Sequence, residues 1–462
     1  MKITIFQSGK GDCLLLCGKG EKGRILVDGG MANAYSKFVA PHLGELAEKK
    51  LPLDLVYLSH IDEDHIAGVL QLMHDHVDWR VHDFQLQQGN HDHPAPESPR
   101  PPKIKEIWHN SFHEMLEDNQ GKIIDLTAAS SSGGTLDQAA AAAQISGLLA
   151  ASANTLFGTG IAALQEAAAE QLGIASSIPQ AIQLSRRVSA EQLDIPLNKR
   201  FGKKLAFVRE DVPPPKPIKI GPLRISVIGP FAKDLEVLRK DWNKWLDKNN
   251  EKLARIKEQA RRDAERLGTS DIRKLLELQI AEAKRLGNRS EVTPPNLASL
   301  MLFVEEGMRT LLLTGDGHSE DIVKGLAFHK KLDSAGRLHV DVLKVQHHGS
   351  EHNIEKDFVQ RVSADHYIFC GNGENENPDL KVLDLILDSR LNAVDFAATH
   401  PKAQQPFKFW LNSSESATTT PAAKAHMRQV QELLAARKQQ SAGRLTDEFL
   451  EGQTPSFELS ID

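Results

Sequence analysis

A dense cluster of imidazole and carboxylate side chains follows a short apolar run early in the chain. Residues 55–58 are apolar and could form a buried strand, and residues 59–65 read Ser-His-Ile-Asp-Glu-Asp-His. So many hydrated groups are costly to pack together unless a cation neutralises them. A strand that ends in such a cluster presents its side chains at its carboxyl tip, where open α/β sheets usually place their chemistry. The stretch therefore predicts half of a metal site.

Two later strand-like segments also end in metal-ligand residue types. Residues 309–313 lead to Asp316, and residues 340–345 lead to His347 and His348. One such segment could occur by chance, but the same order of strand and ligand occurs three times in this chain. The repetition is the specific signal for a metal site built from oxygen and nitrogen ligands.

Two further polar residues end predicted strands, and each has two interpretations. His109 follows residues 104–108, where it could be a metal ligand, a direct neighbour of one, or a structural histidine. Asp28 closes residues 24–28 before Gly29-Gly30. It could support the metal site from behind the ligands, or it could cap a turn.

The remaining pattern gives a coarse order of elements. We expect a helix over residues 66–76 and strand-like pieces around a Pro-rich loop over residues 77–112. Residues 218–228 are predicted to form a strand. Near the end of the chain we expect a helix over residues 422–438 and a short strand over residues 456–461.

The composition and the pattern of apolar residues argue against a disulfide-rich protein, a secreted protein and a membrane-spanning protein. The net charge of −6 gives no global basic signal, and three cysteines cannot form a disulfide framework, which fits a reducing, cytoplasmic compartment. The first residues are strand-like, so no signal peptide is expected. A long uncharged run between Asp137 and Glu166 is mostly Ala with several polar residues. Because it is weakly apolar for a bilayer core, we expect two Ala-rich helices and no membrane span.

The spaced motifs resemble the metallo-beta-lactamase superfamily, which carries His-x-His-x-Asp-His, a later bridging Asp and a final His. The closer resemblance is to the metallo-hydrolase domain of DNA-uptake competence channels. That group shares Ser-His-x-Asp-x-Asp-His at 59–65, Leu-Leu-Thr-Gly-Asp at 312–316 and Leu-Lys-Val-x-His-His-Gly-Ser at 343–350. Gly11-Asp12 also fits. One departure is Asn377, which stands where the channels have a His before Pro.

The resemblance implies an α/β fold, a four-layer αββα sandwich with helical insertions. Four parts are expected: residues 1–112 and 218–411 as a discontinuous metallo-beta-lactamase-like hydrolase domain, 113–217 as an Ala-rich helical insertion with a Pro-rich linker, 232–290 as a charged helical insertion, and 412–462 as a linker and C-terminal helix.

The resemblance also implies a ligand set for one or two divalent metal ions, Zn or Mn. The expected metal ligands are His60, Asp62, Asp64, His65, Asp316 and His347. Asp316 would bridge the two ions, and Asp64 and His348 are the expected catalytic residues, with His348 a ligand or a proton donor. Because Asp62 stands where the superfamily has a His, the first site is richer in oxygen, which favours Mn over Zn. Asn377 leaves a one-metal site open as an alternative.

The function implied is metal-dependent hydrolysis of phosphodiester bonds by a metal-bridged hydroxide, most simply in a nuclease. Basic helices over residues 239–289 could bind nucleic acid, although interleaved acidic residues favour a solvated surface. One alternative is a hydrolase of small phosphoesters or lactones. Another is a weakly active interaction subunit, in which the helical insertions would bind a protein partner.

Overall fold

The computed structural model describes residues 1–110, 192–236, 298–391 and 397–461, together with residues 180, 184, 187 and 188. The chain divides into two compact units. The first comprises Met1–Asn110, Arg187–Glu236 and Asn288–Asp462, and the second comprises Ser111–Arg186 and Val237–Gly287. The Ala-rich helices expected between Asp137 and Glu166 and the basic helices of 239–289 lie outside the described residues. The strands and helices with assigned bounds all lie in the first unit.

One sheet of this unit has six strands in the order β14-β1-β2-β3-β4-β5. Its strands are β1 (Lys2–Phe6), β2 (Leu14–Gly18), β3 (Lys22–Val27), β4 (Leu55–Tyr57), β5 (Ile107–Trp108) and β14 (Ser456–Ser460). Strands β3, β4 and β5 run parallel, whereas β1 pairs antiparallel with both β2 and β14. Side chains alternate between faces, so Ile3 and Ile5 both enter the core shared with the second sheet.

The second sheet has eight strands in the order β13-β12-β11-β10-β9-β8-β7-β6. Its strands are β6 (Ile218–Ile220), β7 (Leu223–Gly229), β8 (Met301–Glu306), β9 (Arg309–Leu313), β10 (Leu338–Lys344), β11 (Val362–Phe369), β12 (Phe407–Leu411) and β13 (Leu445–Phe449). Strands β9 to β13 are parallel. In β9, Leu311 and Leu313 enter the core between the sheets, while Leu312 faces the helices. Both faces are covered, which explains the continuous apolar run.

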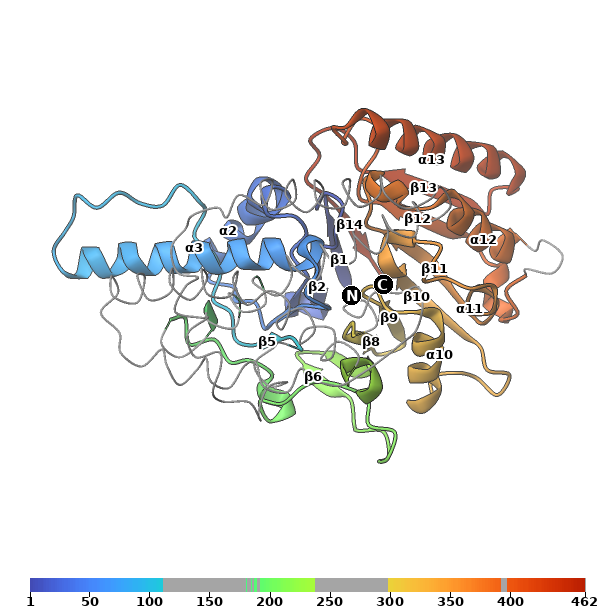
Figure 1. Cartoon of the computed structure of the whole chain (residues 1–462), viewed down its shortest axis with the longest axis horizontal. Coiled ribbons are helices and arrows are strands. Elements are labelled where there is room, and N and C mark those ends of the chain that lie inside the picture. Colours follow the sequence, from blue (N-terminus) through green and yellow to red (C-terminus); the bar gives the residue numbers. More distant parts are fainter. Residues whose placement is uncertain are drawn as a thin grey trace, which may run out of the picture. The chain divides into compact units, whose positions relative to one another are not determined.

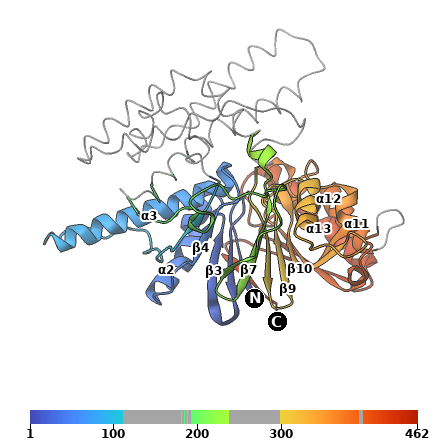
Figure 2. The ribbon, with the colours of Figure 1, turned by 90° about the horizontal axis from the view of Figure 1, so that it is seen from below.

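Helices cover the outer faces of both sheets. On the side of the six-stranded sheet lie α1 (Ala32–Ala34), the π-helix η2 (Tyr35–Val39), α2 (Ala40–Glu48) and α3 (Glu63–Gln87), and on the other side lie α10 (Ser319–Phe328), α11 (Lys356–Arg361), α12 (Leu380–Leu391) and α13 (Pro421–Gln440). Figure 2 shows the paired sheets between α2 and α3 on one side and α11, α12 and α13 on the other. The predicted αββα sandwich is confirmed. No helix in the described part of the chain is long and apolar enough to span a membrane.

The structure corrects the expected course of residues 77–87. Val77, Trp79 and Val81 alternate with polar residues and so imitate a strand, yet α3 continues through them to Gln87. The helix satisfies its backbone groups internally, and Trp79 is held by the carbonyl of Ser98 at 3.0 Å and by the Arg100 guanidinium over its ring.

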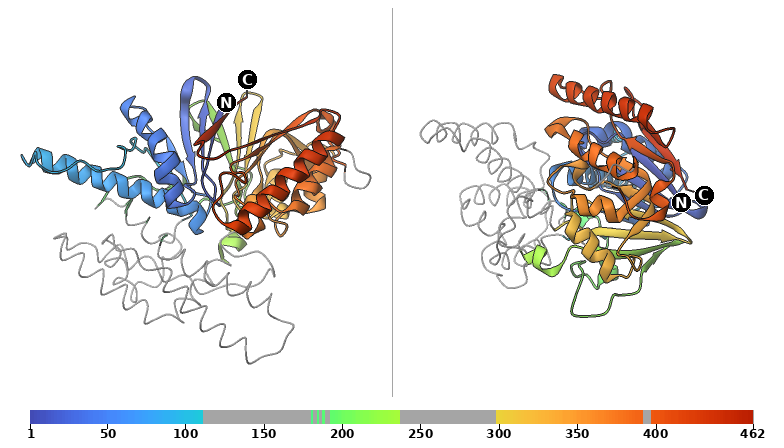
Figure 3. Two further views of the ribbon diagram at one scale, coloured as in Figure 1. Left: turned by 90° about the horizontal axis from the view of Figure 1, so that it is seen from above. Right: turned by 90° about the vertical axis from the view of Figure 1, so that its right-hand side faces the viewer.

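Two other elements differ from expectation. Residues 218–228 form a β-hairpin, β6 and β7, because Gly221-Pro222 turns the chain. The tail contributes β13 to the eight-stranded sheet as well as the predicted helix and final strand (Figure 3).

Strands from both sheets end at one edge of the sandwich. The carbonyl of Ser59, after β4, accepts a hydrogen bond of 2.7 Å from the amide of Leu300, just before β8. The hydroxyl of Tyr57 donates to the carbonyl of Leu300. The loops after β4, β9 and β10 therefore meet where the two sheets join.

Candidate metal centre

Four imidazoles from these loops surround the carboxylate of Asp316. Its Oδ2 lies 3.6 Å from His60 Nε2, 3.8 Å from His347 Nε2 and 3.4 Å from His348 Nε2. Its Oδ1 lies 3.4 Å from His65 Nε2. The side chain of Asp316 is buried, so these imidazoles take the place of water around it.

Two more carboxylates stand at the more exposed side of the cluster. Asp62 Oδ2 lies 3.6 Å from His60 Nε2, and Asp64 Oδ2 lies 3.3 Å from His348 Nε2. Asp62 is the N-cap of α3 and Asp64 lies in its first turn, where the helix dipole favours negative charge. The structure thus brings all six predicted metal ligands and His348 into one cluster, and their binding of metal remains a prediction.

Carboxylates behind two of the imidazoles determine which ring nitrogen carries the proton. His65 Nδ1 lies 3.0 Å from Asp28 Oδ2, and His348 Nδ1 lies 3.1 Å from Asp12 Oδ1. An ionised carboxylate only accepts hydrogen bonds, so His65 Nδ1 carries a proton. The contact between His348 Nδ1 and Asp12 Oδ1 lacks hydrogen-bond geometry, but the charge of the nearby carboxylate favours a proton on that nitrogen. Each Nε2 then offers a lone pair when its ring is neutral, and the two Nε2 atoms face each other at 3.3 Å.

The other two imidazoles are oriented in the same way. His347 Nδ1 lies 2.5 Å from Asn353 Oδ1, and the Asn353 amide is fixed because its Nδ2 donates to the Asp316 carbonyl at 2.8 Å. His60 Nδ1 lies 3.0 Å from Ser59 Oγ, whose hydroxyl donates to Asp28 at 2.8 Å. All four histidines therefore turn Nε2 towards one point. Carboxylate or amide partners on the remote ring nitrogen are typical of metal-bound histidines.

The spacing of these atoms fits ligands that share a cation. The contacts of 3.6 and 3.8 Å from Asp316 to His60 and His347 are too long for hydrogen bonds. The contacts of 3.3 Å from His348 Nε2 to His65 Nε2 and to Asp64 are longer than most hydrogen bonds. Nitrogen and oxygen ligands about 2.0–2.2 Å from a tetrahedral Zn²⁺ lie roughly 3.3–3.6 Å apart. Within the described residues, the buried His60 Nε2 and Asp316 Oδ1 have no hydrogen-bond partner. A divalent ion would supply that partner, so the residues fit a metal ion.

The buried carboxylates of the cluster need positive charge nearby, either from protonated imidazoles or from a cation. Burial alone would lower the pKa of His65, but Asp316, Asp28 and Asp12 raise that pKa well above its usual value. The pKa of His348 is raised against burial by Asp316 and Asp12. Burial raises the pKa of Asp316, but the imidazoles outweigh burial and lower it well below its usual value. Without metal, protons on His65 and His348 balance the carboxylates, and a bound cation would displace them.

Asp12 and Lys344 also belong to this cluster, although in the sequence they stood only within matching motifs and no role was assigned to either side chain. Lys344 ends β10, is buried, and forms an ion pair with Asp12. Asp12 comes from the loop between β1 and β2, and a Cβ at Gly11 would lie 1.7 Å from the Asp64 carbonyl oxygen. Only glycine permits this approach. Two features of the sequence could have indicated these residues: the Gly before Asp12, and the charged Lys344 at the end of an apolar strand.

His109 lies beside the cluster, but it is not among the imidazoles around Asp316. Its backbone is held by Asn198, which accepts from the His109 amide at 3.0 Å and donates to its carbonyl at 2.7 Å. Burial, followed by the neighbouring His60, lowers the pKa of His109 to about 3, so the ring is neutral. Its role as a ligand remains a prediction.

Three residues of the cluster adopt left-handed backbone conformations. The φ angles are +53° at Asp28, +45° at His347 and +54° at His348. Such conformations are uncommon for non-glycine residues and concentrate at functional sites, where the surrounding structure holds them.

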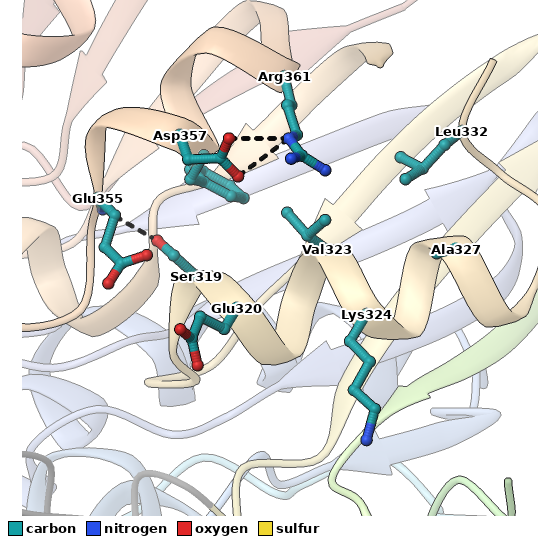
Figure 4. Close-up of a pocket in the computed structure, with 10 residues that line it drawn as sticks. Ser319, Glu320, Val323, Lys324, Ala327, Leu332, Glu355, Asp357 and Arg361 are labelled. Atoms are coloured by element: carbon teal, nitrogen blue, oxygen red, sulfur yellow. Dashed lines mark hydrogen bonds and ion pairs between the residues drawn. The ribbon is translucent and has the colours of Figure 1, made fainter. Parts of the chain in front are cut away.

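A separate depression of about 270 Å³ lies between α10 and α11. Figure 4 shows Ser319, Glu355 and Arg361 among the residues that line it, with Arg361 paired to Asp357. None of the cluster residues lines this depression, so it is not part of the candidate metal centre.

The part of the chain that carries the first half of the cluster matches a known protein family. Residues 8–123 match the metallo-beta-lactamase superfamily. The matched segment carries the cluster residues from Asp12 to His65, while Asp316, His347 and His348 lie beyond it. This superfamily consists largely of metal-dependent hydrolases, which agrees with a buried group that could hold a metal ion. No curated protein matches the chain, so the closer resemblance to competence channels remains a prediction.

Proposed function

We propose that this protein is a metal-dependent hydrolase of phosphodiester bonds and acts as a nuclease. The observation that carries the proposal is the set of four imidazoles that present Nε2 around one shared carboxylate, Asp316. The choice of a nuclease over other hydrolases rests on the resemblance of the three sequence motifs to those of competence channels.

One or two divalent ions held here would lower the pKa of water and offset the negative charge that develops on the phosphoryl oxygens. In this proposal His60, Asp62, Asp64, His65, Asp316 and His347 hold the ions. Asp28 and Asn353 orient the rings of His65 and His347 through hydrogen bonds, and Asp12 lies against His348 Nδ1. His348 serves as a ligand or donates a proton to the leaving oxygen, and Asp64, at the exposed side, is the other expected catalytic residue.

Asp62 and Asp64 lie at the exposed side of the centre, with side chains 24% and 20% exposed, so a substrate would reach the ions from that side. Mixed imidazole and carboxylate ligation suits Zn or Mn, and the oxygen of Asp62 favours Mn.

Three further parts of the proposal rest on the sequence. Nucleic acid would bind along the basic helices of 239–289, and a protein partner could bind the insertions 113–217 and 232–290. Residues 113–179 and 237–290, which make up most of these insertions, lie outside the described residues. A reducing, cytoplasmic location fits the three cysteines, which are buried and free.

The test is cleavage by the purified full chain loaded with Mn²⁺ or Zn²⁺, with single-stranded and double-stranded DNA and RNA as substrates. The inactive control is the double variant Asp64→Ala/His65→Ala, and Asp357→Asn, at an exposed position of α11, is the matched surface control. We expect cleavage by the wild type and by D357N only. Equal cleavage by the double variant would refute the proposal. Turnover of lactones or small phosphoesters without cleavage of nucleic acid would establish the small-molecule alternative.

A further inference from the structure

The ammonium group of Lys344 lies in a buried position lined by oxygen atoms, next to the candidate metal centre. It forms an ion pair with Asp12 Oδ2, donates to the Gly315 carbonyl at 3.2 Å, and lies 3.7 Å from Asp316 Oδ1. The residue is 1% exposed. A lysine is almost never buried to this degree unless it is paired.

Both oxygens of the Asp12 carboxylate face a side-chain nitrogen. Its Oδ2 contacts the Lys344 ammonium, and its Oδ1 lies 3.1 Å from His348 Nδ1. Asp12, His65, Asp316 and His348 each offer a ligand atom, all within 4.8 Å of one another, which is a spacing that could hold a metal ion. The Lys344 ammonium already lies against two of these four residues.

We propose that Lys344 is a built-in cation that fills this oxygen-lined position and so excludes a metal ion from it. Asp12 then remains paired with Lys344 and next to His348 Nδ1, and it does not become a metal ligand. Metal ions bind only on the Nε2 side of the four imidazoles. The inference rests on the proposed metal centre and adds to it: Lys344 is a positioning residue that sets how many ions the cluster takes.

The chemistry of the position supports this assignment. Two carboxylate oxygens and a backbone carbonyl are ligands that hard divalent cations prefer. Lys344 supplies one positive charge there permanently, at the end of a strand that also carries the loop of His347 and His348. An ion in the same position would have to break the ion pair with Asp12 and move a buried ammonium group.

The test compares two substitutions of Lys344 in the full chain. Lys344→Ala removes the ammonium and leaves its space empty, whereas Lys344→Met removes the charge but fills the space. Each protein is equilibrated by dialysis against Mn²⁺, and bound Mn²⁺ per chain is measured by elemental analysis. We expect K344A to bind one more Mn²⁺ than the wild type and to gain more in Tm on adding Mn²⁺. K344M should gain no ion.

Asp12→Asn gives a second test that does not depend on the folding of K344A. Because Asp12 is not a ligand in this proposal, D12N should bind as many Mn²⁺ ions at saturation as the wild type, with affinity about 10–100-fold weaker through His348. A loss of one ion in D12N, or an unchanged count in folded K344A, would overturn the inference. If the wild type binds no Mn²⁺ or Zn²⁺, the proposed metal centre fails, and this inference fails with it.

Discussion

Replacing Asp28 by Asn isolates the contribution of a residue that is not itself an expected ligand. Asp28 accepts three hydrogen bonds: from the Ser59 amide at 2.7 Å, from the Ser59 hydroxyl at 2.8 Å and from His65 Nδ1 at 3.0 Å. Its φ of +53° is a conformation that Asn adopts readily, so the backbone should tolerate the change. The substitution therefore alters charge and hydrogen bonding while it keeps the shape.

The expected effect follows from the position of one proton. Asn has one oxygen and an amide group that donates, so it cannot accept all three hydrogen bonds. When its amide faces His65 Nδ1, that nitrogen must accept, and the ring proton moves to Nε2. This is the atom 3.4 Å from Asp316 Oδ1 that would bind metal. Loss of such a partner typically weakens metal binding by about 10–100-fold, or about 1.4–2.8 kcal/mol.

The assay is competition for Mn²⁺ or Zn²⁺ between the protein and a chelating dye, with Tm measured with and without metal. D28N should bind metal about 10–100-fold more weakly, and its metal-free form should lose about 1.5–3 kcal/mol of unfolding free energy with the charged hydrogen bond. D357N, which breaks only an exposed pair with Arg361, should match the wild type. The reasoning is refuted if D28N binds metal as tightly as the wild type.

Three further predictions rest on the same geometry. The raised pKa values of His65 and His348 stabilise the metal-free fold fully below their unfolded value of about 6.5, and this contribution is lost as pH rises through the raised values, whereas metal binding strengthens as the protons leave. The Tm difference between metal-loaded and metal-free protein should therefore widen from about pH 6 to about pH 8, and a constant difference would contradict this protonation scheme. Asp316→Ala removes the carboxylate that all four imidazoles face, so bound metal per chain measured by elemental analysis should fall, and an unchanged content would show that the ligands lie elsewhere. Burial raises the pKa of Cys13 and of Cys370 well above the usual thiol value, so a thiol reagent should label neither before denaturation, as mass spectrometry can check.

The order of apolar runs and polar residues along the sequence was enough to predict most of the candidate site. His60, Asp316 and His347 each follow a strand whose apolar run is continuous or nearly so, because that strand is buried on both faces. Parallel strands bring their carboxyl ends to one edge, so a ligand after each strand predicts a cluster there. This reasoning needs no knowledge of which strands pair.

Contacts between distant segments were harder to predict. Asp12 reaches the cluster because Gly11 lies against the backbone of Asp64, a contact with no periodic signal. Lys344 is the last residue of β10, and nothing in the strand pattern distinguishes it from an ordinary strand-end lysine. Its pairing with Asp12 depends on how the two sheets stack. The length of α3 was missed because Val77 and Trp79 fit a strand period as well as a helix.

The origin of the ligands from two different sheets has a mechanical consequence. His60 and His65 follow a strand of the six-stranded sheet, whereas Asp316 and His347 follow strands of the eight-stranded sheet. An ion shared by these side chains would act as a tether across the seam of the sandwich. Removing this ion would do more than stop the proposed hydrolysis, because the edge of the sandwich would open more often. Amide hydrogen exchange in the loops after β4 and β9 would then become faster before the rest of the fold responds.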